Sequence, residues 1–389
     1  MQPASFALDD CLVILRHHAG ELAVLNPTAR VIWEGQQRGW RVERIVADLV
    51  ATYHISEEAA GIDVAACLSL WERNGLLEPT QGEDSSTGTW GAIEERADPR
   101  DFSHVANCSE SGVHTQTYVL FDRAFSVRFS SRGLWDATEP LLAHLGVDSD
   151  MEARHSFCLA EVDGGFGMWR DGRGIARTAS RDGMVFALHR EIQAVGCDRE
   201  WLVALHAAAV SDGEQCIVLA GSGGSGKSTL TAALLKADLI YLGDDVIPLD
   251  RTTREAVPLP LSLNLKPGSL PVLERYYPGI RSLPAVSANG WKVHFFPPPQ
   301  FAEHRPRRSD PVKHLVFVKY EVGVLTRLSP IGSTEALRLL LEGESLPRRP
   351  LQADTVGEMI DWIASVPAYT LRYDNLDDAT ACVQNLFER

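Results

Sequence analysis

The chain has 389 residues, of which 45% are hydrophobic and 23% are charged. This composition is typical of a globular protein, and the length predicts two or three domains. Lysine and arginine number 37 against 52 aspartates and glutamates, which gives a net charge of −15. Because an acidic chain has no general attraction for polyanions, we expect neither a nucleic-acid partner nor a membrane-surface partner.

No apolar run approaches the about 18 residues that span a bilayer, and the N-terminal segment lacks the basic region of a signal peptide. A cytoplasmic protein is therefore expected. The seven cysteines are scattered, without paired or metal-ligand spacing. We expect them to be reduced thiols and expect no zinc site.

The chain begins with the pattern of a hairpin followed by helices. Two apolar segments, 11–16 and 21–25, flank a His-Ala-Gly sequence and predict the two strands and their turn. Asn26 before Pro27 is a good helix start, because asparagine caps helices and proline tolerates the first helical position. Apolar residues with helical spacing predict a second helix over 42–53.

A third helix is predicted to begin after Ser56 and to stop at Asn74-Gly75. The apolar pair Leu76-Leu77 then predicts a short strand. Together these elements predict a small α+β winged-helix domain over residues 1–80. Winged-helix domains often bind DNA, but residues 1–80 hold six basic and eleven acidic side chains, which argues against DNA.

Three segments of this domain carry a family resemblance: LNPTARVIWEG, RVERIVADLVATYHISEE and DVAACLSLWERNGLLE. They resemble the PqqD family, the recognition element of pathways that modify ribosomally made peptides (RiPPs). The resemblance implies that residues 1–80 bind the leader part of a precursor peptide as an added strand along the hairpin edge, beside the third helix. The alternatives are a structural domain without a binding function and a DNA-binding domain.

Residues 81–100 are polar, rich in glycine, serine and acidic residues, and predict a flexible linker. Residues 101–200 alternate between apolar and polar side chains in places and contain Asp-Gly turns. We expect them to form the N-terminal lobe of the domain that follows, with the catalytic part over residues 201–389.

A phosphate-binding loop is the strongest motif in the chain. A buried-strand pattern, 215–220, runs into the sequence GSGGSGKST and then into a helix, which is the strand, loop and helix order that the GxxxxGK[ST] motif requires. Backbone N–H groups and the helix N-terminus would surround phosphate, the lysine would pair with β/γ oxygens, and the serine would ligate Mg²⁺. The predicted nucleotide-binding residues are Gly221, Ser222, Gly223, Gly224, Ser225, Gly226, Lys227, Ser228 and Thr229.

Two adjacent carboxylates, Asp244 and Asp245, follow a short apolar strand after this motif. Alone they could be a turn, but phosphoryl transfer to a hydroxyl needs a metal-holding carboxylate and a proton acceptor, and the pair could supply both. His206 precedes the phosphate-loop strand, and as a lone histidine it is more often a core residue.

Together these residues resemble HPr kinase/phosphorylase and its HPr-kinase-related relatives, whose core is also similar to phosphoenolpyruvate carboxykinase. The segments YLGDDVIPLD, PLPLSLNLKPGS and VPAYTLRYDNLDDA extend the resemblance over most of 115–389. It implies a P-loop α/β core in which Asp245 is the base, Asp244 supports metal or base, and His206 tunes the carboxylates. The glycine-rich, glutamate-containing signature of the phosphorolysis reaction is missing, and Lys266 in its place is either a phosphate contact or a surface side chain.

The sequence therefore predicts a kinase that uses ATP and Mg²⁺ to phosphorylate a serine or threonine hydroxyl of a ribosomally made precursor peptide. Lys227, Asp244, Asp245 and His206 are its expected catalytic residues, and Ser228 and Asp244 its expected metal ligands. The alternatives are nucleotidyl transfer or carboxylate activation on the same peptide, and a nucleotide-gated peptide-binding scaffold. A homo-oligomer is compatible with the resemblance.

Overall fold

The computed structural model describes residues 3–16, 21–73, 76–77, 114–148, 151–196, 201–288, 290–299, 301–302, 306, 308–342 and 352–388. The predicted linker, 81–100, lies outside these residues. The chain is a mixed α/β protein with two compact units. Unit 1 comprises Met1–Gly91, Gly332–Arg338 and Arg348–Ser365, and unit 2 comprises Ala92–Ile331, Leu339–Pro347 and Val366–Arg389. Within the described ranges, no helix is both long and apolar enough to cross a membrane.

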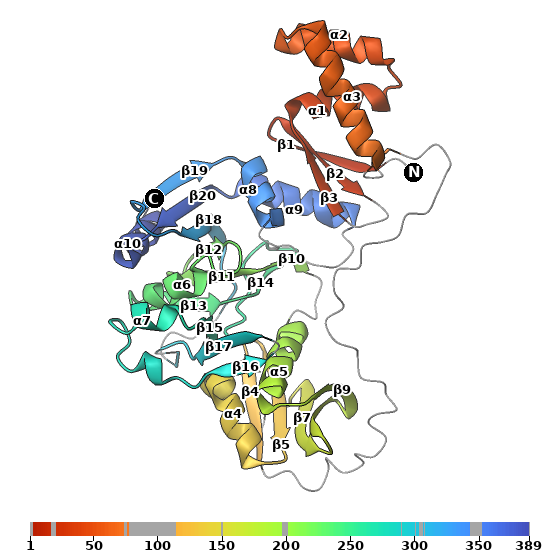
Figure 1. The fold of residues 1–389 in the computed structure, drawn as a ribbon. Coiled ribbons are helices and arrows are strands. Elements are labelled where there is room, and N and C mark those ends of the chain that lie inside the picture. Colours follow the sequence, from red (N-terminus) through yellow and green to blue (C-terminus); the bar gives the residue numbers. More distant parts are fainter. Residues whose placement is uncertain are drawn as a thin grey trace. The chain divides into compact units, whose positions relative to one another are not determined.

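Unit 1 begins with a three-stranded antiparallel sheet in the order β1-β2-β3, followed by three helices (Figure 1). The predicted hairpin strands and all three predicted helices are confirmed. The Asn26 side chain accepts a hydrogen bond of 2.8 Å from the Ala29 N–H, which confirms the predicted helix start. The elements are β1 (Ala4–Leu8), β2 (Cys11–Arg16), β3 (Glu21–Leu25), α1 (Pro27–Gln37), α2 (Val42–Tyr53) and α3 (Glu57–Arg73).

The winged-helix arrangement predicted for this unit is not confirmed. Leu76 and Leu77 form a bend instead of the predicted strand, and β1, which no pattern predicted, adds a strand before the hairpin. The core nevertheless joins sheet and helices, because Trp33 of α1 and Trp71 of α3 meet edge to face with ring centroids 5.4 Å apart. Such a contact between large apolar rings fixes the angle at which the two helices pack.

A segment from far along the chain completes unit 1. Helix α9 (Ala353–Ser365) packs against β1, and Gly357 of α9 leaves room for the Phe6 ring, since a Cβ there would lie 3.1 Å from it. The first turn of α8 (Ser333–Glu342) is bound as well. The Thr334 N–H donates to Asp9 Oδ2 at 2.8 Å, and its hydroxyl donates to the Leu8 carbonyl at 3.0 Å.

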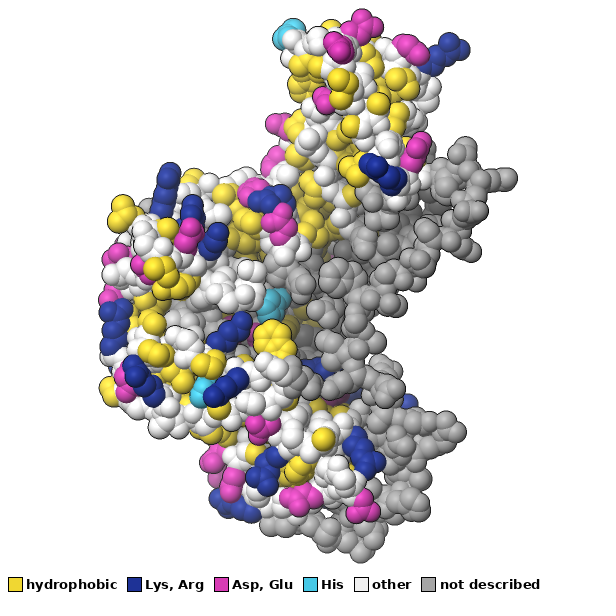
Figure 2. Space-filling view, in the orientation of Figure 1, with side chains coloured by type: hydrophobic (Ala, Val, Ile, Leu, Met, Phe, Trp, Pro, Cys, Tyr) yellow, Lys and Arg dark blue, Asp and Glu magenta, His cyan; other side chains and the backbone are white. Residues whose placement is uncertain are grey.

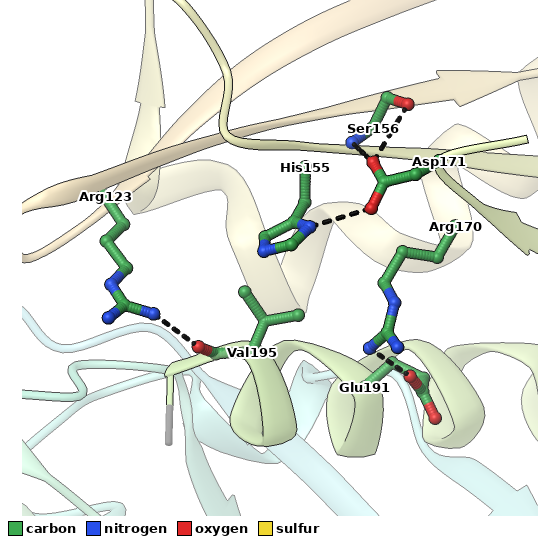
Figure 3. A network of polar contacts seen from close by, with 7 residues as sticks. All are labelled: Arg123, His155, Ser156, Arg170, Asp171, Glu191 and Val195. Carbon is green, nitrogen blue, oxygen red and sulfur yellow. Dashed lines mark hydrogen bonds and ion pairs between the residues drawn. The ribbon is translucent and has the colours of Figure 1, made fainter. Parts of the chain in front are cut away.

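The N-terminal part of unit 2 is a six-stranded sheet in the order β6-β4-β5-β7-β8-β9, with α4 (Arg132–Leu142) and α5 (Arg181–Gly196) in the same hydrophobic cluster. Polar contacts fasten α5 to this sheet (Figure 3). Arg123 donates to the Val195 carbonyl at 3.0 Å, and Arg170 pairs with Glu191 at 3.2 Å. The strands are β4 (His114–Leu120), β5 (Arg123–Phe129), β6 (Gly146–Val147), β7 (His155–Val162), β8 (Gly165–Arg170) and β9 (Arg173–Thr178).

A second six-stranded sheet, in the order β13-β11-β12-β18-β20-β19, carries the phosphate-loop motif. Strand β12 is apolar and fully buried, as a central strand must be, and it pairs antiparallel with β11 and parallel with β18. Helices α6 (Lys227–Leu235) and α10 (Leu376–Phe387) pack on each other (Figure 1). The strands are β11 (Ala207–Ser211), β12 (Cys216–Ala220), β13 (Ile240–Gly243), β18 (Val312–Tyr320), β19 (Arg327–Ile331) and β20 (Ala368–Tyr373).

Two small sheets complete unit 2. One pairs β10 (Trp201–Leu205) with β14 (Ile247–Asp250), and the other has the order β15-β17-β16. The latter strands are β15 (Leu263–Leu265), β16 (Val286–Ala288) and β17 (Trp291–Phe296), and the short helix α7 (Ser269–Leu273) follows β15. Figure 2 shows Lys, Arg, Asp and Glu side chains together on the face that is drawn.

The expectation that all cysteines are reduced is wrong. Cys158 on β7 is disulfide-bonded, whereas Cys11, Cys67, Cys216 and Cys382 are free. Scattered spacing in the sequence gave no signal for this bond, because a disulfide depends on proximity in the fold and not on spacing along the chain.

The Asp9 contact makes a prediction about the stability of unit 1. Asp9 has a left-handed backbone (φ 49°), which glycine and asparagine both tolerate, so Asp9→Gly removes only the side chain that caps α8. We expect Asp9→Gly to lower the free energy of unfolding by about 1 kcal/mol, the usual net contribution of a hydrogen bond, because Asp9 Oδ2 no longer accepts from Thr334. Asp9→Asn, which keeps an acceptor oxygen, is the control and should unfold at the wild-type urea midpoint. Equal midpoints for all three proteins would contradict the capping role.

Candidate functional site

The phosphate-loop sequence folds as a tight loop between β12 and α6. Gly221, Gly224 and Gly226 have φ values of 147°, 91° and 96°, a region that glycine alone enters readily. A side chain at Gly226 would also collide with the Tyr373 hydroxyl, which lies 3.2 Å from the Gly226 carbonyl. The glycines are therefore required by the course of the backbone, which turns at the N-terminus of α6, where anions are favoured.

Lys227 is held inside this loop. Its side chain is buried, and its Nζ donates to the carbonyls of Gly221 at 2.5 Å and Ser222 at 3.3 Å. Burial lowers the pKa of Lys227, while the charges of Asp244 and Asp245 oppose this shift. The ammonium group is thus held by the loop carbonyls, close enough to both carboxylates for their charges to act on it.

Asp244 directly follows β13 and is only 3% exposed. Its Oδ2 accepts a hydrogen bond of 3.3 Å from the Asn264 backbone N–H. Burial, together with the charge of Asp245, raises the pKa of Asp244 to about 7, against the opposing effects of Ser228 and Lys227. A carboxylate is therefore held in the interior beside the start of α6.

Asp245 is the more accessible of the two carboxylates. It is half-buried, and its backbone has a φ of 80°, a conformation that is rare for residues other than glycine and asparagine and that is often found at functional sites. Its side chain accepts a hydrogen bond from the Asn264 amide nitrogen. Asn264 of β15 thus contacts both carboxylates.

Two histidines lie on or beside elements that form this site. His206 stands between β10 and β11, directly before Ala207, which pairs with Ala220 at the end of the phosphate-loop strand. The sequence missed the other, His189, which is buried on α5 and contacts the Phe295 ring with centroids 5.5 Å apart. Burial lowers the pKa of His189, and the charge of Asp245 opposes this shift. Its only sequence signal was a polar residue on the buried face of a helix.

A pocket of about 530 Å³ opens at the phosphate loop. Lys266, just after β15, lines it, with its Nζ 3.8 Å from the position of a Cβ built on Gly224. The same Nζ lies 5.6 Å from the centre of the exposed Trp291 ring. Because the Lys266 charge lowers the pKa of Lys227, the two ammonium groups repel each other, as expected where a polyanion would bind between them. Of the two interpretations of Lys266, the structure favours a position at the phosphate site.

The pocket extends from the loop toward the C-terminal elements. Its lining residues are Gly224, Ser225, Gly226, Lys227, Ser228, Thr229, Asn264, Lys266, Gly268, Ser269, Val272, Arg275, Tyr320, Tyr373, Asp374, Asn375 and Leu376. Six of the nine predicted loop residues line it. Asp244, Asp245 and His206 are not among the lining residues, and Asp244 instead reaches the pocket through its neighbour Ser228.

The donor set fits a hard divalent cation. The described residues contain no group of three or more His, Cys, Asp or Glu side chains that could hold a metal ion. Mg²⁺ at nucleotide phosphates needs fewer protein ligands than that, usually one or two oxygens beside phosphate and water. Asp244 Oδ1 is buried without a hydrogen-bond partner among the described residues, and the Ser228 hydroxyl lies beside this carboxylate. These two residues could hold such an ion.

Comparisons with known proteins found one matching family and similar solved structures. Residues 11–77 match the family described as coenzyme PQQ synthesis protein D (PqqD), which confirms the resemblance of the N-terminal segment. Among solved structures, TbiB1 in complex with the TbiA(beta) leader peptide is 26% identical and covers 21% of this chain and 94% of that chain, with a TM-score of 0.20. The Hpr(Ser) kinase/phosphatase from Coxiella burnetii is 12% identical over 48% of this chain and 93% of that chain, with a TM-score of 0.23.

One curated relative is named as a GTPase. The tRNA modification GTPase MnmE from Methylorubrum populi is 31% identical over 221 residues, which are 51% of this chain and 46% of that protein. The match thus spans about half the length of each protein.

The buried Asp244 carboxylate makes a prediction about pH-dependent stability. Its pKa is raised on folding from 3.8 to about 7, so its contribution to stability is fully present below pH 4 and is lost as the pH rises through 7. Asp244→Asn removes this buried charge. In metal-free protein with EDTA, we expect the urea midpoint of Asp244→Asn to exceed that of the wild type at pH 8 and to converge with it near pH 4.

Asp238→Asn is the control, because Asp238 is exposed and the substitution makes the same chemical change there. It should follow the wild type at both pH values. A lower midpoint for Asp244→Asn at pH 8 would show that Lys227 and Asn264 more than offset the burial of the charge.

Proposed function

We propose that this protein is a kinase that transfers the γ-phosphoryl group of ATP, with Mg²⁺, to a serine or threonine hydroxyl of a ribosomally made precursor peptide. The N-terminal unit would hold the leader of that peptide. The observation that carries the proposal is the meeting of a phosphate loop, a buried lysine and two adjacent carboxylates in one compact unit of the chain. Phosphoryl transfer needs these groups, because its catalysis depends on positioning and on charge stabilisation.

Each residue has a role that its position supports. The loop N–H groups and Lys227 would bind the β- and γ-phosphates, and Lys266, just after β15, would add a second positive charge. Mg²⁺ held by Ser228 and Asp244 would neutralise charge on the phosphate oxygens. Asp245 is the better candidate for the proton acceptor, since it is half-buried and therefore reachable by a peptide hydroxyl, whereas Asp244 is enclosed.

The N-terminal unit offers a surface suited to a peptide. Exposed apolar side chains follow one side of α3, where Ile62 is 64% exposed and Leu70 is 48% exposed, with the exposed Ala66 between them. Residues spaced by four lie on the same side of a helix. The sheet also ends at β3, whose outer edge pairs with no other described strand. A strand added at β3 could place its apolar side chains on α3.

The GTPase relative makes guanine nucleotide an alternative donor. The phosphate loop itself does not distinguish ATP from GTP, because it contacts phosphates and not the base. The same reaction carried out with each nucleotide separates the two donors, and a protein that binds nucleotide yet modifies no peptide would favour the scaffold alternative.

The kinase proposal predicts the behaviour of two active-site variants. With ATP, Mg²⁺ and a leader-bearing precursor, the peptide should gain about 80 Da per phosphoryl group in a mass spectrum. Lys227→Ala should lower turnover by about 10²- to 10³-fold, because a charge that stabilises the transition state is lost. Asp245→Asn should lower kcat by about 10²- to 10⁴-fold with little change in nucleotide affinity, because only the proton acceptor is lost.

Lys236→Ala and Asp238→Asn are the controls, since both side chains are exposed and lie beyond the C-terminal end of α6. Both should phosphorylate the peptide at the wild-type rate. Full turnover by Asp245→Asn would refute the assignment of the base, and an unmodified peptide with wild-type protein and either nucleotide would refute the proposed activity.

If the exposed apolar side chains of α3 contact the leader, their replacement should weaken leader binding. Exchanging both Ile62 and Leu70 for glutamate should weaken binding of a fluorescent leader peptide at least tenfold, because apolar contact area is lost. The melting temperature should stay unchanged, since both side chains are exposed. Ala65→Glu, exposed on another side of α3, is the control and should bind the leader normally. Val64 is unsuitable for this test because it is fully buried. Normal leader binding by the double variant would remove α3 from the recognition surface.

A further inference from the structure

Asn264 holds a position that no sequence motif assigns. It is the central residue of β15 and pairs with Phe295 of β17. Its backbone N–H donates to Asp244 Oδ2 at 3.3 Å, and its amide nitrogen donates to the Asp245 carboxylate. One residue therefore contacts both carboxylates of the site from a third element of the fold.

The amide oxygen of Asn264 has no such partner. Asn264 Oδ1 is buried and accepts no hydrogen bond within the described part of the chain, and the same holds for Asp244 Oδ1. The orientation of the amide follows from its neighbour, because the side that faces a carboxylate must be the N–H₂ group. A buried oxygen without a hydrogen-bond donor is unfavourable. A cation bound by both Asn264 Oδ1 and Asp244 Oδ1 would satisfy the two oxygens together.

Asn264 also lies near the phosphate loop, where a nucleotide-associated cation would bind. Asn264 lines the pocket together with Ser228 and Lys266. Lys266 follows β15 two residues after Asn264, and both side chains line the same pocket. The available oxygens are a carboxylate, an amide and a hydroxyl, which are the ligand types that Mg²⁺ and Mn²⁺ accept and that zinc and copper do not prefer.

We infer that Asn264 is a ligand of the divalent cation that accompanies the nucleotide, through Oδ1, together with Asp244 and Ser228. The inference rests on the proposed function and extends it by a ligand outside the phosphate-loop and Asp-Asp motifs. The same side chain holds Asp245 through its amide nitrogen, so it joins the cation site to the proposed proton acceptor. Loss of the oxygen and loss of the N–H₂ group should therefore have separable effects.

Two substitutions separate these effects. Asn264→Leu has a similar size but lacks both the oxygen and the N–H₂ group. Asn264→Asp keeps an oxygen ligand but replaces the donor to Asp245 with a carboxylate. Asn385→Leu, an exposed asparagine on α10, controls for the substitution itself. Binding of Mn²⁺ in the presence of ADP is measured on the full chain by the loss of the free Mn²⁺ signal in electron paramagnetic resonance, without peptide or turnover.

We expect Asn264→Leu to weaken Mn²⁺ binding at least about tenfold, and Asn264→Asp to retain or increase it. Asn385→Leu should match the wild type. The kcat of Asn264→Asp should fall even at saturating metal, because Asp245 loses its donor. If the melting curve shows that Asn264→Leu does not fold, Asn264→Ala replaces it with a smaller side chain.

Two outcomes would overturn the inference. One is wild-type Mn²⁺ affinity in folded Asn264→Leu or Asn264→Ala. The other is equal weakening by the leucine and aspartate variants, which would make Asn264 a support for Asp245 alone. Failure of the proposed function looks different: wild-type protein would bind Mn²⁺ and ADP with the predicted dependence on Asn264 but would never phosphorylate a peptide.

Discussion

The burial of the Asp244 carboxylate is the constraint on which the site depends. A charge that is 3% exposed next to a second carboxylate is unfavourable unless other groups compensate for it. Here the compensation comes from Lys227 at the start of α6 and from the Asn264 backbone N–H on β15. Asp244, Lys227 and Asn264 belong to or adjoin three different elements of unit 2, namely β13, α6 and β15. The site therefore forms only when these elements have packed together.

Chain connectivity links the unit that matches PqqD to the phosphate-loop sheet. Helices α8 and α9 lie in sequence between β19 and β20, which pair with each other in the phosphate-loop sheet. The start of α8 is held by Asp9, and α9 packs on β1, within the unit that matches PqqD. Strand β20 ends at Tyr373, whose hydroxyl lies 3.2 Å from the Gly226 carbonyl. Residues 1–80 are thus connected to unit 2 through this later segment as well as through residues 81–100.

The elements that the sequence predicted well are those with strong local signals. Asn26 before Pro27, the apolar spacing over 42–53 and the GSGGSGKST loop each contain most of the information needed for their own conformation. Elements that depend on distant partners were missed. Strand β1 is stabilised by β2 and α9, and the Cys158 disulfide depends on proximity alone.

The candidate site shows the same division. Lys227, Ser228 and the Asp pair stand in recognisable patterns, and the structure brings Lys227 and Ser228 next to Asp244. His189 and Asn264 reach the carboxylates only because α5 and β15 pack there. A polar residue in the middle of the apolar segment LNL was the one available signal for Asn264.

The central claim, transfer of the γ-phosphoryl group to a leader-bound peptide, is tested most directly by the fate of labelled ATP. The precursor is incubated with the protein and Mg²⁺ in parallel with ATP labelled at the α- or the γ-phosphorus, and the peptide is then isolated. The account predicts label on the peptide from γ-labelled ATP alone, and its loss when the leader is removed. Label from α-labelled ATP would show nucleotidyl transfer instead, and an unlabelled peptide in both reactions would contradict a kinase.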